Sequence, residues 1–181
     1  PFGAHNPGQR ELPFCIHTRY STQQAILEDI VASLYAQGMR KLIILSGHGG
    51  NNFKGMIRDL AFVYPDFLII AVDWFSIVPP KDYFEAVVDD HAGESETSVM
   101  MHYHPELVNL AEAGDGESKP FAIPSLNEKV GWAPRHWDKA TVDSGVGNPK
   151  NASAEKGERY MKPVVEKLSK LFTEVGQGSL Y

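Results

Sequence analysis

The sequence has few of the features that mark secreted, membrane-spanning or nucleic-acid-binding proteins. Its 181 residues include one cysteine, Cys15, so no disulfide can form within the chain. No apolar run is long enough to cross a bilayer. Acidic residues outnumber basic ones by 23 to 17, and the net charge of −6 favours a small or cationic partner over nucleic acid. We therefore expect a cytoplasmic protein that binds neither a membrane nor a nucleic acid.

Internal repeats and low-complexity tracts are also lacking, while hydrophobic residues make up 43% of the chain. A chain of this length and composition can bury one core, so we expect residues 1–181 to form a single domain. The first residue is Pro1 and not methionine, and we expect that further sequence precedes it.

The most informative segment is an apolar run that breaks into glycines. Residues 42–45 are Leu-Ile-Ile-Leu, which is typical of a strand buried on both faces of a parallel sheet. Residues 47–50 are Gly-His-Gly-Gly, and Asn51 or Asn52 can cap the helix that follows. The apolar side chains of that helix repeat at helical spacing: Phe53, Met56, Ile57, Leu60, Ala61 and Tyr64. His48 is thus predicted at the carboxyl end of a strand, where open α/β sheets place their ligands.

Two other interpretations of this loop stay open. A glycine turn before a helix can cradle a phosphate. However, the chain lacks the lysine of the G-x-x-x-x-G-K-[ST] motif and the spacing of G-x-G-x-x-G. The loop can also be a structural turn with an incidental histidine.

Helices and strands are predicted to alternate through the first part of the chain. Ser21 and Gln24 have the spacing of a capping box, at the start of a helix that Gly38 ends. A strand over 41–46, a helix and a second apolar strand over 67–72 follow. This order is typical of an α/β fold with right-handed connections between parallel strands.

The second part of the chain is less regular. Residues 82–88 are compatible with a short helix, and another helix should stop near Pro105. Residues 114–149 are rich in Gly, Pro, Ser and Asp without periodicity, as functional or interfacial connections often are. Asn151 or Ser153 can cap a final amphipathic helix.

A second polar cluster occupies residues 89–98, Asp-Asp-His-Ala-Gly-Glu-Ser-Glu-Thr-Ser. Imidazoles and carboxylates together are the usual ligands of Zn, Mn or Fe. Glu94 and Glu96 offer oxygen ligands to complement His48, and His91 offers either a third ligand or a general acid/base. The plain alternatives are a histidine satisfied inside a turn and acidic side chains that stabilise a helix dipole.

Three segments have the order and separation that one known family shows, namely 43–51, 72–74 and 90–98. The segment Gly-Val-Gly-Asn-Pro at 145–149 adds to the likeness. The chain resembles the creatininase (creatinine amidohydrolase) family, in a His-Gly-Gly-Asn subgroup rather than creatininase itself.

The resemblance implies a three-layer αβα sandwich with a mainly parallel sheet and a homo-oligomer, commonly a hexamer. It also implies two divalent metal ions, bridged by an aspartate, and hydrolysis of an amide or ring bond by metal-bound water. Carried over by position, His48 would bind metal and His91 would be the general acid/base. Asn51 and Glu96 would orient the metal ligands by hydrogen bonding.

The chain departs from the family pattern at three places. Creatininase has a metal-binding glutamate where this chain has Gly50, so we expect Glu94 to supply the carboxylate. Creatininase has an aromatic residue where this chain has Gly49, so a clamp shaped for creatinine is not expected. Gly49 and Trp74 would instead line the substrate site. The family's Glu-x-His motif and bridging aspartate belong before Pro1, so these residues would hold at most part of a dinuclear site.

The leading hypothesis is a metal-dependent hydrolase that uses metal-activated water on a small cyclic amide, formamide or related ring carbonyl compound. A rival hypothesis is a non-catalytic binding or assembly subunit with an incomplete metal site. A third is a sugar-phosphate binder that uses the glycine loop.

Overall fold

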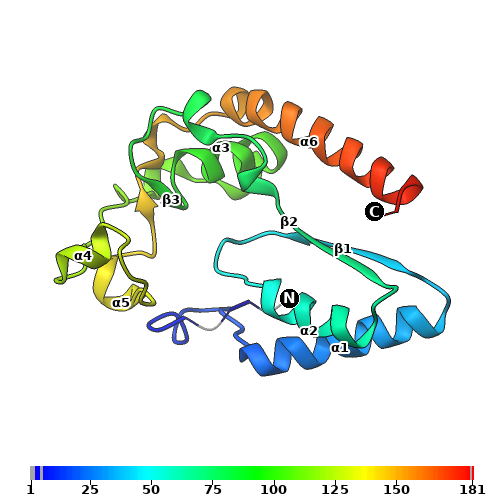
Figure 1. Cartoon of the computed structure of the whole chain (residues 1–181). Coiled ribbons are helices and arrows are strands. Elements are labelled where there is room, and N and C mark those ends of the chain that lie inside the picture. The colour runs from blue at the N-terminus through cyan, green and yellow to red at the C-terminus, as the bar shows by residue number, and fades with distance from the viewer. Residues whose placement is uncertain (1–2, 5, 180) are drawn as a thin grey trace. The chain divides into compact units, whose positions relative to one another are not determined.

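The computed structural model describes residues 3–4, 6–179 and 181, which are drawn in colour in Figure 1. Two compact units divide the chain. The first consists of Pro13–Ile77 and Glu166–Tyr181 together with the start of the chain, and the second of Asn6–Leu12 and Val78–Val165.

The first unit contains the predicted alternation of helices and strands. Its elements are α1 (Tyr20–Ala36), β1 (Lys41–Ser46), α2 (Lys54–Val63), β2 (Leu68–Asp73) and a 3-10 helix (Trp74–Ser76). The strands β1 and β2 are parallel, with Ser46 opposite Asp73, and α1 and α2 cover one face of this pair (Figure 1). Side chains from both helices, from β2 and from the residue before β2 build the core, namely Leu27, Val31, Met56, Leu60, Phe67 and Ile69. The α/β class is therefore confirmed.

The predicted capping box at Ser21 is wrong, because α1 begins one residue earlier. Arg19 precedes the helix and makes no capping hydrogen bond through its side chain. The Gln24 amide, expected to complete the box, instead donates to Asp59 of α2 at 3.3 Å. A tertiary contact thus engages the Gln24 side chain, which the local pattern assigned to the start of α1.

The second unit consists of short elements. Its strands β3 (Asp89–His91) and β4 (Val146–Gly147) pair antiparallel, and α3 (Glu94–Tyr103) starts inside the second polar cluster. Two short helices and four 3-10 helices complete the unit before the last helix: α4 (Pro124–Asn127), α5 (Trp137–Ala140), Pro80–Asp82, Pro105–Leu107, Leu110–Glu112 and Pro149–Asn151.

The helix predicted over 82–88 is wrong, since the 3-10 helix ends at Asp82 and no helix follows until α3. The backbone N–H groups of Glu85 and Ala86 both donate to one carboxylate oxygen of Glu94. Bonds to a distant side chain therefore replace the bonds that a helix would make within this segment.

The final helix, α6 (Ala154–Gln177), runs from the second unit into the first. Ser153 caps it, since its hydroxyl oxygen accepts a hydrogen bond from the N–H of Lys156 at 3.2 Å. Gly157 lies against the backbone carbonyl of Ser98 on α3, where a β-carbon would clash. None of the described helices is long and apolar enough to cross a membrane.

Candidate active site

The His48 loop follows β1 directly and is held by contacts with its own neighbours. The Nδ1 atom of His48 accepts a hydrogen bond from the N–H of Gly50 at 2.9 Å. The backbone oxygen of His48 accepts from the Ser46 hydroxyl at 3.2 Å and from the N–H of Asn51 at 3.1 Å. With Nδ1 accepting, the neutral ring carries its proton on Nε2. A cation would therefore have to replace the Gly50 N–H at Nδ1 or the proton at Nε2.

A cavity of about 280 Å³ lies beside this loop, between the start of α2 and the carboxyl end of β2. Asn51, which we expected to orient metal ligands, lines it together with Lys54, Arg58 and Asp73. Strand ends in an α/β sheet commonly form such a cavity. The expected place of His48 at a strand end is therefore confirmed, whereas its metal role stays a prediction.

The two residues predicted to line the substrate site both lie near Phe75. A β-carbon built on Gly49 would be 3.6 Å from the Phe75 ring. The Trp74 ring meets the Phe75 ring edge to face, with centroids 5.9 Å apart. Two aromatic side chains, Trp74 and Phe75, therefore lie near the glycine loop. Substrate binding by Gly49 and Trp74 stays a prediction.

The His91 turn connects β3 with α3. His91 Nδ1 is 4.0 Å from Glu96 Oε2, and the His91 side chain is 24% exposed. The same Glu96 oxygen accepts the N–H of Ala92 at 2.7 Å, and the Thr97 hydroxyl donates to the Ala92 carbonyl at 3.2 Å. Ala92 has a φ of 50°, which an alanine rarely adopts, so these two bonds fix a strained turn beside the imidazole.

Two residues that sequence reasoning did not select contact this turn. The Trp137 ring lies 4.9 Å from the His91 ring, edge to face at 67°. The Arg135 guanidinium lies 4.8 Å from the centre of the Trp137 ring, and its Nη2 is 2.8 Å from Asp90 Oδ2. Residues 135–137 belong to the aperiodic segment, where no spacing rule relates them to His91.

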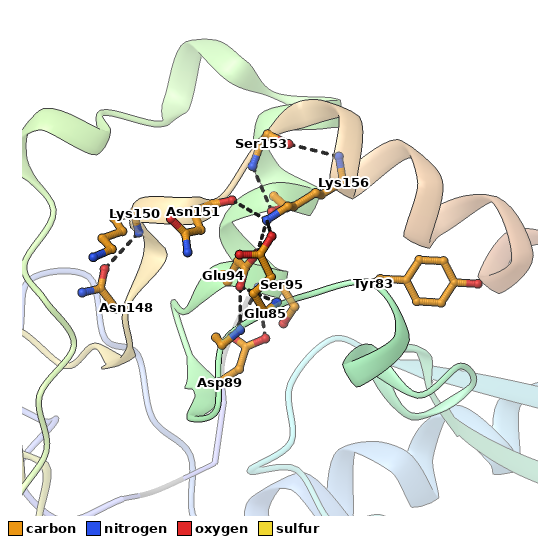
Figure 2. Close-up of polar contacts among 12 residues, drawn as sticks. Tyr83, Glu85, Asp89, Glu94, Ser95, Asn148, Lys150, Asn151, Ser153 and Lys156 are labelled. Atoms are coloured by element: carbon orange, nitrogen blue, oxygen red, sulfur yellow. Dashed lines mark hydrogen bonds and ion pairs between the residues drawn. The ribbon is translucent and has the colours of Figure 1, made fainter.

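Glu94 is buried, and three donors surround its carboxylate; Figure 2 shows Lys156 and Glu85 beside it. Oε1 is 2.6 Å from the Lys156 ammonium, and Oε2 accepts the N–H groups of Glu85 and Ala86 at 2.9 and 2.8 Å. Burial alone raises the pKa of the Glu94 carboxyl, but the ion pair with Lys156 and the two N–H groups lower it below its ordinary value. The same ion pair raises the pKa of Lys156. Glu94 therefore stays ionised and paired.

Glu96 has fewer partners than Glu94. Its side chain is 36% exposed, and among the residues that the structure describes its Oε1 accepts no hydrogen bond. Glu96 also lines a cavity of about 360 Å³ with Met100, Leu110 and Asp143. A carboxylate with a free oxygen at a cavity wall can accept a proton, a hydrogen bond or a cation.

The donor chemistry of His48, His91, Glu94 and Glu96 fits divalent cations such as Zn²⁺ or Mn²⁺. Among residues 3–4, 6–179 and 181, no group of three or more His, Cys, Asp or Glu side chains gathers as a metal site would. The described residues therefore supply isolated ligands and one imidazole–carboxylate pair, His91 with Glu96, rather than three or more metal ligands in one place.

Comparisons with known proteins agree with the predicted resemblance. A family model described as creatininase, creatinine amidohydrolase, matches residues 1–172. The mycofactocin precursor peptide peptidase of Mycobacterium ulcerans (strain Agy99) is 31% identical over 131 residues, which are 70% of this chain and 45% of that protein. The chain thus spans less than half of this curated relative.

Solved structures show the same fold. A crystal structure of a Bacteroides fragilis NCTC 9343 protein assigned to creatinine amidohydrolase is 83% identical, with a TM-score of 0.97 over 100% of this chain and 72% of that one. A creatininase mutant of the Zn-Zn type is 22% identical, with a TM-score of 0.70 over 94% of this chain and 72% of that one. The second likeness shows the fold alone. From the family match over residues 1–172, the chain belongs to the creatininase family.

Proposed function

We propose that this chain forms part of a metal-dependent hydrolase that cleaves a C–N bond in a small cyclic amide, formamide or related ring carbonyl compound. The observation that carries this proposal is the His91 turn, where an imidazole faces a carboxylate at 4.0 Å beside a strained residue. Strain that the surroundings maintain is typical of active sites. Family membership supports the reaction class, and creatininase neighbours of the Zn-Zn type and in an Mn form support a divalent cation.

His91 is the proposed general acid/base, because an imidazole gains and loses a proton near neutral pH. Glu96 lies on the Nδ1 side of the ring and can accept a hydrogen bond from it when the ring is protonated. A bound divalent cation supplies Lewis-acid activation of water and of the substrate carbonyl. The cavity that Glu96 lines is large enough for a small ring compound.

His48 is the proposed metal ligand of the first unit. For the carboxylate ligand, the sequence favours Glu94, but the contacts favour Glu96. Glu94 could bind a cation only by exchanging the Lys156 ammonium or the N–H groups of Glu85 and Ala86. Glu96 already has an oxygen that accepts no hydrogen bond from the described residues. We therefore propose Glu96 as a ligand and Glu94 as the anchor of α3.

Metal analysis and activity assays of the complete protein test these roles. We expect His48→Ala to lower the bound metal and His91→Ala to retain it, with amide hydrolysis greatly reduced, to a small residual rate, in both. We expect Glu96→Gln to lower the metal content more than Glu94→Gln does. His104→Ala is the matched control, because that histidine is exposed and pairs only with Glu106 among the described residues. Full activity in both His48→Ala and His91→Ala would refute the proposal.

The second candidate is a non-catalytic binding or assembly subunit, and the lack of a three-ligand group among the described residues favours it. It predicts no stoichiometric metal in the intact protein and no turnover of any substrate offered. The substrate panel should hold a cyclic amide, formamide, creatinine and a short peptide, since one relative is named a peptidase. Turnover of any of them with bound metal would exclude this candidate.

A further inference from the structure

The His91 ring packs against Trp137, a residue far along the chain. Their ring centroids are 4.9 Å apart at an interplanar angle of 67°, which is an edge-to-face contact. Such pairs contribute beyond the area they bury, because a ring edge meets the electron-rich face of the other ring. Trp137 is 8% exposed, so the contact lies in the interior of the second unit.

Trp137 is itself held in place by its backbone. Its N–H donates to the carbonyl of Pro7 at 3.0 Å, and its carbonyl accepts the Thr141 hydroxyl at 2.8 Å. Because these bonds do not involve His91, they fix the backbone from which the indole extends whether or not the imidazole is present.

Arg135 connects the same segment to the residue before His91. Its Nη2 is 2.8 Å from Asp90 Oδ2, and its guanidinium lies over the Trp137 ring at 4.8 Å. Two consecutive residues of β3 are thus attached to one segment, Asp90 through an ion pair and His91 through its ring. Attachment at two adjacent points limits both the path of the backbone and the rotation of the imidazole.

We propose that Trp137 is a positioning residue for His91, and that Arg135 supports it by holding Asp90 and the indole together. The indole limits the imidazole to the orientation in which Nδ1 faces Glu96. This inference rests on the proposed function, since it assigns a purpose to the orientation of the proposed acid/base.

The test compares Trp137→Leu and Trp137→Phe in the metal-loaded complete protein. Trp137→Leu should lower kcat about 10- to 100-fold with little change in KM, because small misplacements of a catalytic group have effects of this size. Trp137→Phe should recover most of the loss, since it keeps an aromatic ring. Trp132→Leu is the matched control, because Trp132 lies in the same aperiodic segment and is 86% exposed.

An NMR measurement on the same variants gives a readout without turnover. The ring protons of His91 should lose their ring-current shift in Trp137→Leu and keep it in Trp137→Phe. If Trp137→Leu does not fold, Arg135→Met takes its place with a smaller expected loss of kcat, about 3-fold or more, since it removes only the support.

Double variants separate this inference from the proposed function. In the His91→Ala background, Trp137→Leu should lower activity no further, since the indole acts through His91. A further loss there, or normal kcat in both Trp137→Leu and Arg135→Met, would overturn the positioning role while leaving the hydrolase proposal intact. Full activity of His91→Ala alone would instead overturn the proposed function.

Discussion

The two histidine turns of this chain share local hydrogen bonds but differ in the distant contacts that the structure gives them. Among the described residues, hydrogen bonds join the His48 loop to Ser46, Gly50 and Asn51, which are its neighbours in sequence. The His91 turn combines local hydrogen bonds from Glu96 and Thr97 with contacts from residues far along the chain, namely the Trp137 ring and, for the helix that follows, Lys156. A local turn can be recognised in a sequence, whereas a turn held by tertiary contacts depends on the rest of the fold.

The largest expected effect comes from removing a distant support of the His91 turn. Lys156→Met leaves the buried Glu94 carboxylate without its cation, so we expect the free energy of unfolding to fall by about 3 kcal/mol or more. Urea unfolding followed by circular dichroism measures it.

Lys150→Met is the matched control, since Lys150 is exposed and makes no ion pair among the residues that the structure describes. Adding Glu94→Gln to Lys156→Met should restore part of the loss, because no buried charge then lacks a partner. Equal unfolding midpoints for Lys156→Met and Lys150→Met would show that the distant support matters little.

Two glycines, one beside each histidine turn, test the same comparison, and the expected change in stability is of intermediate size. Gly147 of β4 has a φ of 118°, and an added β-carbon would lie 2.6 Å from the Val88 carbonyl oxygen beside β3. Among the residues that the structure describes, no heavy atom lies within 4 Å of a β-carbon built on Gly47. Gly147→Ala should therefore lower the free energy of unfolding by about 2 kcal/mol, from strain and overlap, and Gly47→Ala by less than about 0.5 kcal/mol.

Thermal unfolding of both glycine variants measures the difference. Since β4 pairs with β3, Gly147→Ala should also shift the NMR signals of His91, whereas Gly47→Ala should not. A larger loss of stability from Gly47→Ala than from Gly147→Ala would contradict the expectation that the crowded, left-handed glycine is the more sensitive of the two.

The elements that the sequence predicted correctly are those whose signal is local. The apolar run at 41–46 and the helical periodicity of residues 54–63 produced β1 and α2 within a residue or two. The helix expected at 82–88 is wrong because its N–H groups bind Glu94, a partner that no local pattern reveals.

The same limit applies to the candidate site. The residues of both histidine clusters were identifiable from family order, but their contacts were not. The sequence assigned Glu94 to a metal and had no reason to place Lys156 beside it, because the ion pair joins α3 to α6 across the fold. Trp137 carries no periodic signal and contacts His91 only through the path of an irregular segment.

The smallest expected effect is the dependence of stability on pH that arises from the ion pair of Glu94 and Lys156, which holds the helix after the His91 turn. The pKa of Glu94 is lower in the folded chain than its ordinary value of 4.5. Its ionisation therefore stabilises the fold fully above that pH, and this contribution is lost as the pH falls through the lower, folded value. The pKa of Lys156 is raised above 10.5, so its contribution is lost only as the pH rises beyond that value.

Glu94→Gln isolates this effect, because a glutamine resembles the protonated glutamate. The variant should be less stable than the natural chain at pH 7, and the gap in urea midpoint should narrow as the pH falls below 4.5. Glu158→Gln, at an exposed carboxylate of α6, should show a smaller gap at pH 7. A gap for Glu94→Gln that stays constant as the pH falls from 7 through the folded pKa of Glu94 would mean that packing and not charge holds Glu94.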